Sequence, residues 1–195
     1  YQNLCIYGGI SHMDKKVILI SIDGLRPDAV ETCGHPFVNT LRENGCYSPD
    51  ASSVVPPVTL PAHTSIFYSV PPTRHGIITN DYMPPVRPIR GLAEQLERAD
   101  KTCAAFYGWE PMRHVWTSGN MKYSLFVNEY EEDNSDLLLT QEALSLIERK
   151  EPDFVYLYLV ETDDKGGHDH GWMTSEYMHR VNNAFSCVQQ VYEAV

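Results

Sequence analysis

The sequence predicts an α/β fold built on a largely parallel sheet. Three short runs are apolar almost throughout rather than alternating: Val17–Ile22, Thr102–Phe106 and Phe154–Val160. Continuous apolar runs of this length are typical of parallel strands that are buried on both faces. Helix-type segments separate the runs, and strands that alternate with helices favour a parallel sheet.

Proline and helical spacing predict the helices between these runs. Proline has no N–H to leave unpaired in a first helical turn, so Pro36 and Pro61 are each expected to begin a helix. Another helix is expected around residues 92–96, and Ser135 is expected to cap one that runs to about Lys150. The side chains expected to face the core from these helices are Val38, Leu41, Ile66, Phe67, Val70, Leu92, Leu96, Leu139, Ala143, Leu146 and Ile147.

A final helix with an apolar stripe is predicted at the end of the sequence. The stripe has no cap, no glycine and no polar tail. We therefore expect a chain cut inside or just after this helix, whose stripe should pack on something further along. At the other end, residues 1–12 are expected to form a leader outside the core. The stripe consists of Met173, Tyr177, Val181, Ala184, Val188, Val191 and Val195.

The composition limits the class of protein. The 195 residues fit one domain, and 43% hydrophobic residues are ordinary for a globular chain. The formal net charge of −11 argues against a protein that neutralises nucleic-acid phosphates. The same charge is compatible with carboxylates that gather to bind cations, so we expect no binding of nucleic-acid duplexes.

Cysteines and apolar segments exclude further classes. The five cysteines include no CxxC pair, which argues against a disulfide scaffold or a cysteine-type zinc site. No apolar run approaches the roughly 20 residues of a membrane span, and no signal peptide is visible. A cytoplasmic location is favoured, although a true N-terminus upstream of Tyr1 could carry a signal. The oligomeric state stays open.

A threonine precedes the second helix-starting proline. If Pro61 lies in the first turn, the hydroxyl of Thr59 stands at the positive end of a short helix, where a phosphate or another anion binds well. The alternative is that Thr59 only caps this helix, since threonine is a common cap.

Carboxylates follow two of the three predicted strands. Asp23 comes after the first, and Glu161, Asp163 and Asp164 come after the third. The carboxyl ends of strands in such sheets are where ligands gather. Asp164 and His168 form a D-x-x-G-H pattern whose oxygen and nitrogen suit Zn or Mn. His170 as an alternative ligand and Asp163 in place of Asp164 stay open, and so does a plain exposed acidic turn.

A second acidic stretch carries no function in this interpretation. The segment from Asn128 to Asp136 is rich in carboxylates and lies between predicted elements. Charge runs of this kind are usually solvated, so we expect an exposed loop here.

Taken together, three motifs resemble a known family. VILISIDGLRPD at Val17–Asp28, the stretch Thr59–Asn80, and DKGGHDHGWM at Asp164–Met173 occur in an order and approximate spacing similar to those of the alkaline phosphatase superfamily. Within it, the type I phosphodiesterase/nucleotide pyrophosphatase family is the most similar. The resemblance implies an αβα sandwich with two metal ions, usually zinc. Residues 13–195 would then be the N-terminal part of such a catalytic domain, truncated at its C-terminal end.

The resemblance also implies roles for individual residues. Thr59 matches the nucleophile, and Asp23 matches a ligand of the metal that activates it. Asn80 matches an asparagine that hydrogen-bonds a phosphoryl oxygen. Asp164 and His168 match ligands of the second metal.

The sequence departs from the family in two places. Ala62 stands where an asparagine is common. The family also needs an Asp-His pair and a further histidine downstream, and the chain ends before either. Asp169-His170-Gly171 is too close to His168 to be that pair. The chain is therefore expected to hold about half of the metal ligands.

The expected function is metal-dependent hydrolysis of phosphodiester or nucleotide pyrophosphate bonds through a phospho-threonine. The partner is then a small phosphodiester or nucleotide. The alternatives are a phosphomonoesterase or phosphomutase of the same superfamily and a non-catalytic metal-binding homologue. A sulfatase is disfavoured because Thr59-Leu-Pro-Ala62 lacks the required Cys or Ser.

Overall fold

The computed structural model describes residues 16–84, 89–117 and 119–195, so the expected leader at 1–12 lies outside the described residues. Within these ranges the sheet has four strands, all parallel, in the order β1-β4-β2-β3. The strands are β1 (Val17–Ile22), β2 (Cys103–Tyr107), β3 (Tyr123–Phe126) and β4 (Phe154–Leu159). The predicted α/β fold with a parallel sheet is confirmed.

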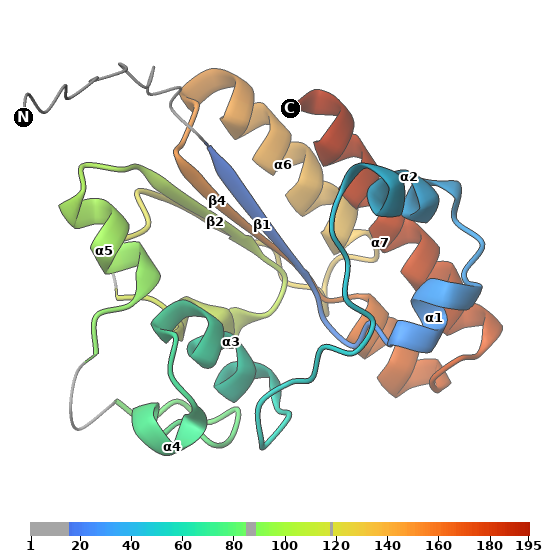
Figure 1. The fold of residues 1–195 in the computed structure, drawn as a ribbon, viewed down its shortest axis with the longest axis horizontal. Helices are drawn as coiled ribbons and strands as arrows, with labels where there is room; N and C mark the ends of the chain where they lie inside the picture. The colour runs from blue at the N-terminus through green and yellow to red at the C-terminus, as the bar shows by residue number, and fades with distance from the viewer. Residues whose placement is uncertain (1–15, 85–88, 118) are drawn as a thin grey trace, which may run out of the picture.

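Helices cover both faces of this sheet, as Figure 1 shows. α3 and α5 lie on one face, and α6 and α7 lie on the other, with α1 and α2 packed outside α7. The arrangement is the expected αβα sandwich. The helices are α1 (Pro27–Thr32), α2 (Pro36–Asn44), α3 (Thr59–Tyr68), α4 (Pro72–His75), α5 (Leu92–Arg98), η1 (Glu110–His114), α6 (Ser135–Lys150), η2 (Thr162–His168) and α7 (Ser175–Ala194).

The strand β4 shows why the apolar runs are continuous. Successive side chains of a strand point to opposite faces. Tyr156 and Tyr158 pack with Phe67 of α3 in one core, whereas Val155 and Leu157 belong to a second core with α6 and α7. Both faces of β4 are buried, so both sets of side chains are apolar or aromatic.

β3 was not predicted. Its four residues alternate between half-buried and exposed, and the strand lies at the edge of the sheet. A search for continuous apolar runs finds central strands of a parallel sheet and passes over a short edge strand of this kind.

The apolar stripe of α7 is covered by other parts of the same chain, so the expectation that it awaits a later segment was wrong for most of its length. Tyr177 and Val181 pack with Ala29 of α1 and Val38 of α2 in a third core. Further along, the helix joins the core that it shares with α6 and β4. Within the stripe, Val195 is exposed.

Two further local predictions were wrong. Ile66 points outward and is 52% exposed, because the buried face of α3 is formed by Leu60, Thr64 and Phe67 instead. Ser135 is the first residue of α6 rather than its cap, and its hydroxyl donates to the Glu161 carboxylate at 3.0 Å.

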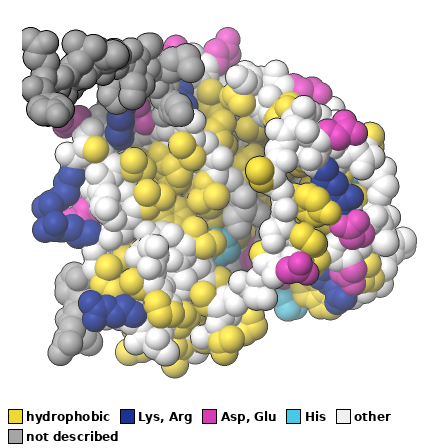
Figure 2. Space-filling view, viewed as in Figure 1, with side chains coloured by type: hydrophobic (Ala, Val, Ile, Leu, Met, Phe, Trp, Pro, Cys, Tyr) yellow, Lys and Arg dark blue, Asp and Glu magenta, His cyan; other side chains and the backbone are white. Residues whose placement is uncertain are grey.

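The remaining edge of the sheet is β1. Figure 2 shows hydrophobic side chains gathered over β1, between α3 on one side and α2 on the other. The side chains of β1 are half-buried apart from the exposed Val17. In the ranges that the structure describes, no helix is long and apolar enough to span a membrane.

Candidate active site

The site forms where β1 and β4 end side by side. Ile22 pairs with Leu159 in the parallel register, and the Asp23 N–H continues the ladder to the Leu159 carbonyl at 2.9 Å. The residues that follow the two strands are therefore neighbours in space although they are far apart in sequence. This is the carboxyl edge of the sheet, where ligands are expected.

The Asp23 carboxylate accepts three hydrogen bonds at this edge of the sheet. Its Oδ2 accepts a hydrogen bond from the Thr59 hydroxyl at 3.1 Å and another from the Tyr158 hydroxyl at 2.6 Å. Its Oδ1 accepts from the Gly24 N–H at 3.1 Å. Because these donors come from α3, β4 and the backbone after β1, the carboxylate is fixed in one orientation.

Thr59 opens α3 as its first residue, and Val58 occupies the cap position without a side-chain cap. The threonine therefore does not cap the helix, and Pro61 lies in the first turn without starting it. The Leu60 N–H of the same turn donates to Asn80 Oδ1 at 3.0 Å. A backbone N–H can only donate, so this contact identifies the amide oxygen and leaves the NH2 group of Asn80 as a donor for another ligand.

His63 links the first turn of α3 to β1 by two hydrogen bonds. Its Nδ1 donates to the Thr59 carbonyl at 2.8 Å, which leaves Nε2 to accept from the Ser21 hydroxyl at 2.9 Å. Burial lowers the pKa of this imidazole, so it stays neutral at physiological pH.

After β4 the chain makes a π-helical turn, η2. The Gly166 N–H donates to the Glu161 carbonyl at 2.9 Å, an i→i+5 bond. Such turns are rare and often occur at functional sites. The wider turn brings Asp163 beside His168, five residues later, with Oδ2 and Nε2 at 3.5 Å.

Asp163 also packs against the turn after β1. Gly24 has a positive φ of 65°, and a Cβ placed on it would lie 2.6 Å from Asp163 Oδ1. Only glycine fits both requirements. Burial, together with the Asp23 carboxylate, raises the pKa of Asp163 to about 6. Because the charge of Asp23 disfavours ionisation of Asp163, a cation bound beside both carboxylates would be stabilising.

Two hollows meet at this point. The wide lobe, about 680 Å³, extends past Arg26, Pro57 and Trp172. The narrow lobe, about 170 Å³, extends past Trp109, Glu129 and Tyr130. Both lobes are lined by the same central residues, Asp23, Thr59, Asn80, Asp163 and His168.

The structure thus brings most of the residues selected from the sequence into one place. Asp23, Thr59, Asn80 and His168 line both lobes, while Asp164 lines only the narrow one. The alternative Asp163 is the more central of the two aspartates. In the described part of the chain, His170 lines neither lobe and is exposed.

Sequence reasoning missed Glu129. The segment from Asn128 to Asp136 was expected to be an exposed loop, yet Glu129 is 1% exposed and Asp136 is 3% exposed. Glu129 lines the narrow lobe. Burial raises the pKa of Glu129 to about 8, and the negative charge of Asp164 is the second largest cause of this shift. In a segment this acidic, nothing in the sequence separates a buried carboxylate from its exposed neighbours.

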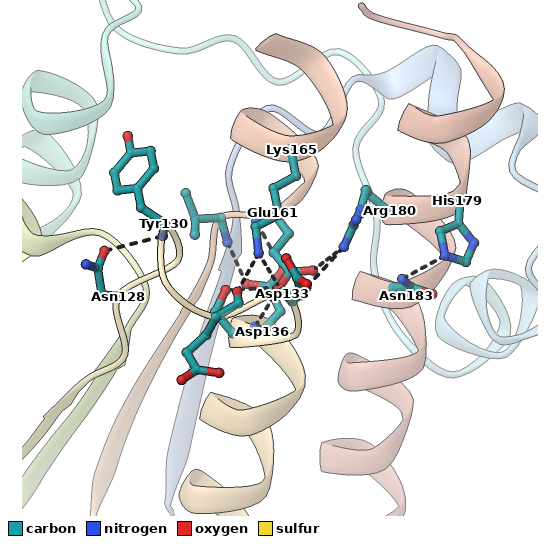
Figure 3. Close-up of polar contacts among 12 residues, drawn as sticks. Asn128, Tyr130, Asp133, Asp136, Glu161, Lys165, His179, Arg180 and Asn183 are labelled. Carbon is teal, nitrogen blue, oxygen red and sulfur yellow. Dashed lines mark hydrogen bonds and ion pairs between the residues drawn. The ribbon is translucent and has the colours of Figure 1, made fainter. Parts of the chain in front are cut away.

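Behind the site, a buried charge network holds η2 against α6 and α7. Figure 3 shows Glu161 between Asp136 and Arg180. Arg180 Nη1 donates to Glu161 Oε2 at 3.0 Å, and Lys165 Nζ lies 3.6 Å from Oε1. Asp136 in turn accepts from the Val160 N–H at 2.9 Å. Glu161, which the sequence grouped with the carboxylates at the strand end, is therefore a structural residue.

The donor types suit a divalent metal, but the donor count is low. Carboxylates of Asp23 and Asp163, the Thr59 hydroxyl and the His168 imidazole are oxygen and nitrogen ligands that zinc accepts. Catalytic zinc usually has three protein ligands. Among residues 16–84, 89–117 and 119–195, no three His, Cys, Asp or Glu side chains are arranged to hold one ion.

Comparison with known proteins identifies the family of this chain. Residues 17–195 match the model of the type I phosphodiesterase / nucleotide pyrophosphatase family. The chain belongs to this family. Ectonucleotide pyrophosphatase/phosphodiesterase family member 1 of Rattus norvegicus is 26% identical in an alignment 180 residues long that covers 82% of this chain and 19% of that protein. A venom phosphodiesterase of Macrovipera lebetinus is 27% identical in an alignment 181 residues long that covers 82% of this chain and 21% of that protein.

Solved structures show the same fold. Murine ectonucleotide pyrophosphatase/phosphodiesterase 5, an inactive threonine-to-alanine variant in complex with AMP, superimposes with a TM-score of 0.76 at 20% identity. Phosphonoacetate hydrolase from Sinorhizobium meliloti, in complex with phosphonoacetate, gives 0.70 at 16% identity. These alignments cover 92% and 93% of this chain. The chain spans about half the length of these structures, 53% and 54%, and about a fifth of the two relatives above.

Proposed function

We propose that this protein hydrolyses phosphodiester or nucleotide pyrophosphate bonds with Thr59 as the nucleophile. The observation that carries the proposal is the position of Thr59 at the junction of two lobes. A phosphodiester has two substituents on one phosphorus, and two lobes that share a nucleophile can each take one. A phosphomonoester would leave one lobe without a use.

The residues around Thr59 support this role. Its hydroxyl proton points at Asp23 Oδ2. In the proposed step the Thr59 oxygen forms a bond to phosphorus as the bond to the leaving ester oxygen breaks, and the proton lost from the Thr59 hydroxyl ends on that leaving oxygen. Water then attacks the phosphorus, the bond to the Thr59 oxygen breaks, and one proton of the water returns to Thr59. The structural neighbour that is inactive after a threonine-to-alanine change is consistent with a threonine in this role.

Asn80 and the start of α3 support the same reaction from the side of the phosphate. Attack on phosphorus gathers negative charge on its non-bridging oxygens. The Asn80 amide, oriented by the Leu60 N–H, offers donors to one of these oxygens. The partial positive charge at the start of α3 acts in the same direction.

We further propose that two divalent metal ions, zinc by preference, bind here. Asp23 and Thr59 would hold one ion, and His168 with an aspartate the other. Such ions supply positive charge that lowers the pKa of a coordinated hydroxyl and stabilises the transferred phosphoryl group. The contact of Asp163 with His168, and its packing against Gly24 next to Asp23, favour Asp163 over Asp164 as that aspartate.

Replacement of the nucleophile tests the proposal. In the zinc-loaded protein, Thr59→Ala should abolish hydrolysis of bis(4-nitrophenyl) phosphate while metal content is retained. Thr73→Ala, an exposed threonine of α4, is the matched control and should turn over like wild type. A Thr59→Ala variant with near-wild-type kcat would remove Thr59 from the mechanism.

The choice of substrate separates the proposal from its main alternative. A phosphodiesterase should prefer bis(4-nitrophenyl) phosphate to 4-nitrophenyl phosphate. The opposite preference would indicate a phosphomonoesterase of the same superfamily. Bound metal without either activity would indicate a non-catalytic homologue.

A further inference from the structure

The narrow lobe carries more acid than the proposed reaction uses. The proposed reaction uses Asp23, Asp163 and His168, which line both lobes. The carboxylates of Glu129 and Asp164 line only the narrow lobe and have no role in that reaction. No Lys or Arg is among the described residues that line the narrow lobe; Lys165, whose charge acts to lower the pKa of both acids, lies outside the lobe and contacts Glu161. The complement of this wall is a positive charge.

Glu129 is the acid of this wall whose hydrogen bonds are not satisfied within the described residues. The residue is 1% exposed, and in the described part of the chain neither of its carboxylate oxygens has a hydrogen-bond partner. A buried carboxylate without partners is costly, and native proteins rarely keep one without a reason. The missing partner is then a group that enters the lobe from outside.

The surrounding backbone makes room for this carboxylate. The Glu129 N–H donates to the Gly108 carbonyl at 3.3 Å. A Cβ on Gly108 would lie 3.4 Å from Glu129 Oε2 and 2.7 Å from Val160 Cγ1. The glycine therefore leaves the space in which the carboxylate lies, between the ends of β2 and β4.

Two aromatic residues flank the acids. Trp109 follows β2, Tyr130 follows Glu129, and both line the same lobe. Burial, then the Asp164 and Glu129 carboxylates, raise the pKa of the Tyr130 hydroxyl, which places this side chain near both acids. Aromatic faces attract organic cations, whereas they are not ligands for zinc or magnesium.

We propose that the narrow lobe binds a protonated primary amine carried by one substituent of the phosphodiester, with Glu129 as the acceptor of its N–H groups. The inference rests on the proposed function. A primary ammonium is favoured over a quaternary one because the unpartnered oxygens of Glu129 need N–H donors. A metal ion bound to Glu129 is the alternative that the test below separates from an amine.

Three substrates that differ only in the retained substituent test this proposal. They are the 4-nitrophenyl phosphodiesters of 2-aminoethanol, of choline and of propanol. In the zinc-loaded protein the aminoethyl ester should have a kcat/KM about 10- to 100-fold above that of the propyl ester, the range that one charge-assisted hydrogen bond supplies. The choline ester should lie between them.

Glu129→Gln should remove the preference for the aminoethyl ester, so that the ratio of its kcat/KM to that of the propyl ester falls to near one. Glu131→Gln, an exposed acid on the same loop, is the matched control and should keep the preference. Because the comparison of esters in wild type stands by itself, the test does not depend on how well a variant folds.

Other outcomes would overturn the inference. Equal kcat/KM values for the three esters in wild type would contradict an amine site, although turnover of the propyl ester would still support the proposed function. A preference that survives Glu129→Gln would move the site elsewhere. An equal loss on all three esters with less bound zinc would make Glu129 a metal ligand. If no ester is hydrolysed, the proposed function fails, and the amine site is then tested by whether 2-aminoethyl phosphate raises Tm more than propyl phosphate does.

Discussion

Glu161 and Glu129 are both buried glutamates beside the candidate site, yet their surroundings are opposite. Glu161, 4% exposed, accepts from Ser135 and Arg180 and lies near Lys165. Glu129, 1% exposed, has no hydrogen-bond partner within the described residues. The first carboxylate has its hydrogen-bond partners within the fold, whereas the second is buried in the wall of the narrow lobe without one.

This difference teaches how to interpret buried acids near an active site. A partnered carboxylate links elements, here η2, α6 and α7, and its removal should damage stability. An unpartnered one adds little to stability, and its removal should change what the cavity binds. The two residues can therefore be separated by unfolding measurements alone.

The largest effect is expected from removing the partnered acid. Glu161→Ala leaves Arg180 and Lys165 without their shared carboxylate and should lower the free energy of unfolding by about 3 kcal/mol, because one member of a buried pair is left uncompensated. Glu176→Ala is the control, since this more exposed carboxylate also contacts Arg180 at 3.4 Å, and it should cost less than about 1 kcal/mol. Urea denaturation measures both. Equal effects would contradict the structural role of Glu161.

A smaller loss of stability is expected at the glycine beside the unpartnered acid. Gly108→Ala places a methyl group 2.7 Å from Val160 Cγ1 and should destabilise the protein by about 1–3 kcal/mol through overpacking. Gly34→Ala offers a useful comparison, because a Cβ there meets no atom within 4 Å and only its positive φ of 69° is strained. Gly108→Ala should also weaken the preference for the aminoethyl ester, which Gly34→Ala should not.

The pH dependence of stability should distinguish Glu129 from Asp136, its neighbour in the charge network. Burial raises the pKa of Glu129 to about 8 and, with Glu161, raises that of Asp136 to about 7. Between the ordinary and the raised values the folded protein binds more protons than the unfolded chain, so stability falls as pH rises from about 5 to 8. The slope approaches about 1.4 kcal/mol per pH unit for each proton.

Denaturation of the metal-free protein at several pH values checks this dependence. Glu129→Gln should flatten the curve above about pH 7 and roughly halve the slope between about pH 5 and 7, where Asp136 still contributes. A curve that rises with pH over this window would show that neither carboxyl is buried as described.

The smallest effect is expected from Glu129→Gln near pH 4, where the Glu129 carboxyl is protonated in both the folded and the unfolded chain. The amide then replaces a neutral carboxyl that has no partner to lose, so the free energy of unfolding should change by less than about 1 kcal/mol. Thermal unfolding of the variant beside wild type measures the change. A loss as large as that of Glu161→Ala would mean that Glu129 is held by contacts of the same kind, and the contrast between the two glutamates would disappear.

The central part of the fold follows from the sequence because simple physics dominates there. Runs such as Phe154–Val160 must be buried on both faces, and the carboxyl ends of β1 and β4 then bring Asp23 near the acids after β4. Thr59 and Asn80 were located by their resemblance to a family motif, and the structure places both at that edge. Their chemical roles remain predictions.

The parts that could not be predicted depend on tertiary context. β3 is an edge strand with a weak pattern, and Ile66 faces outward because the axis of α3 is set by what it packs against. Glu129 and Asp136 are indistinguishable in sequence from exposed acids around them. Only the contacts of α6 with the end of β4 decide that Asp136 is buried.

The π-helical turn has a consequence for comparing sequences of this family. The D-x-x-G-H pattern places its aspartate four residues before His168, which is Asp164. The residue four positions after Leu159, the last residue of β4, is Asp163. The two counts differ by one residue, and the i→i+5 bond from Gly166 to Glu161 is where the chain accommodates it. A count anchored on His168 and a count anchored on β4 therefore select different aspartates, so the contacts of the two side chains, and not the spacing alone, decide which of them belongs to the site.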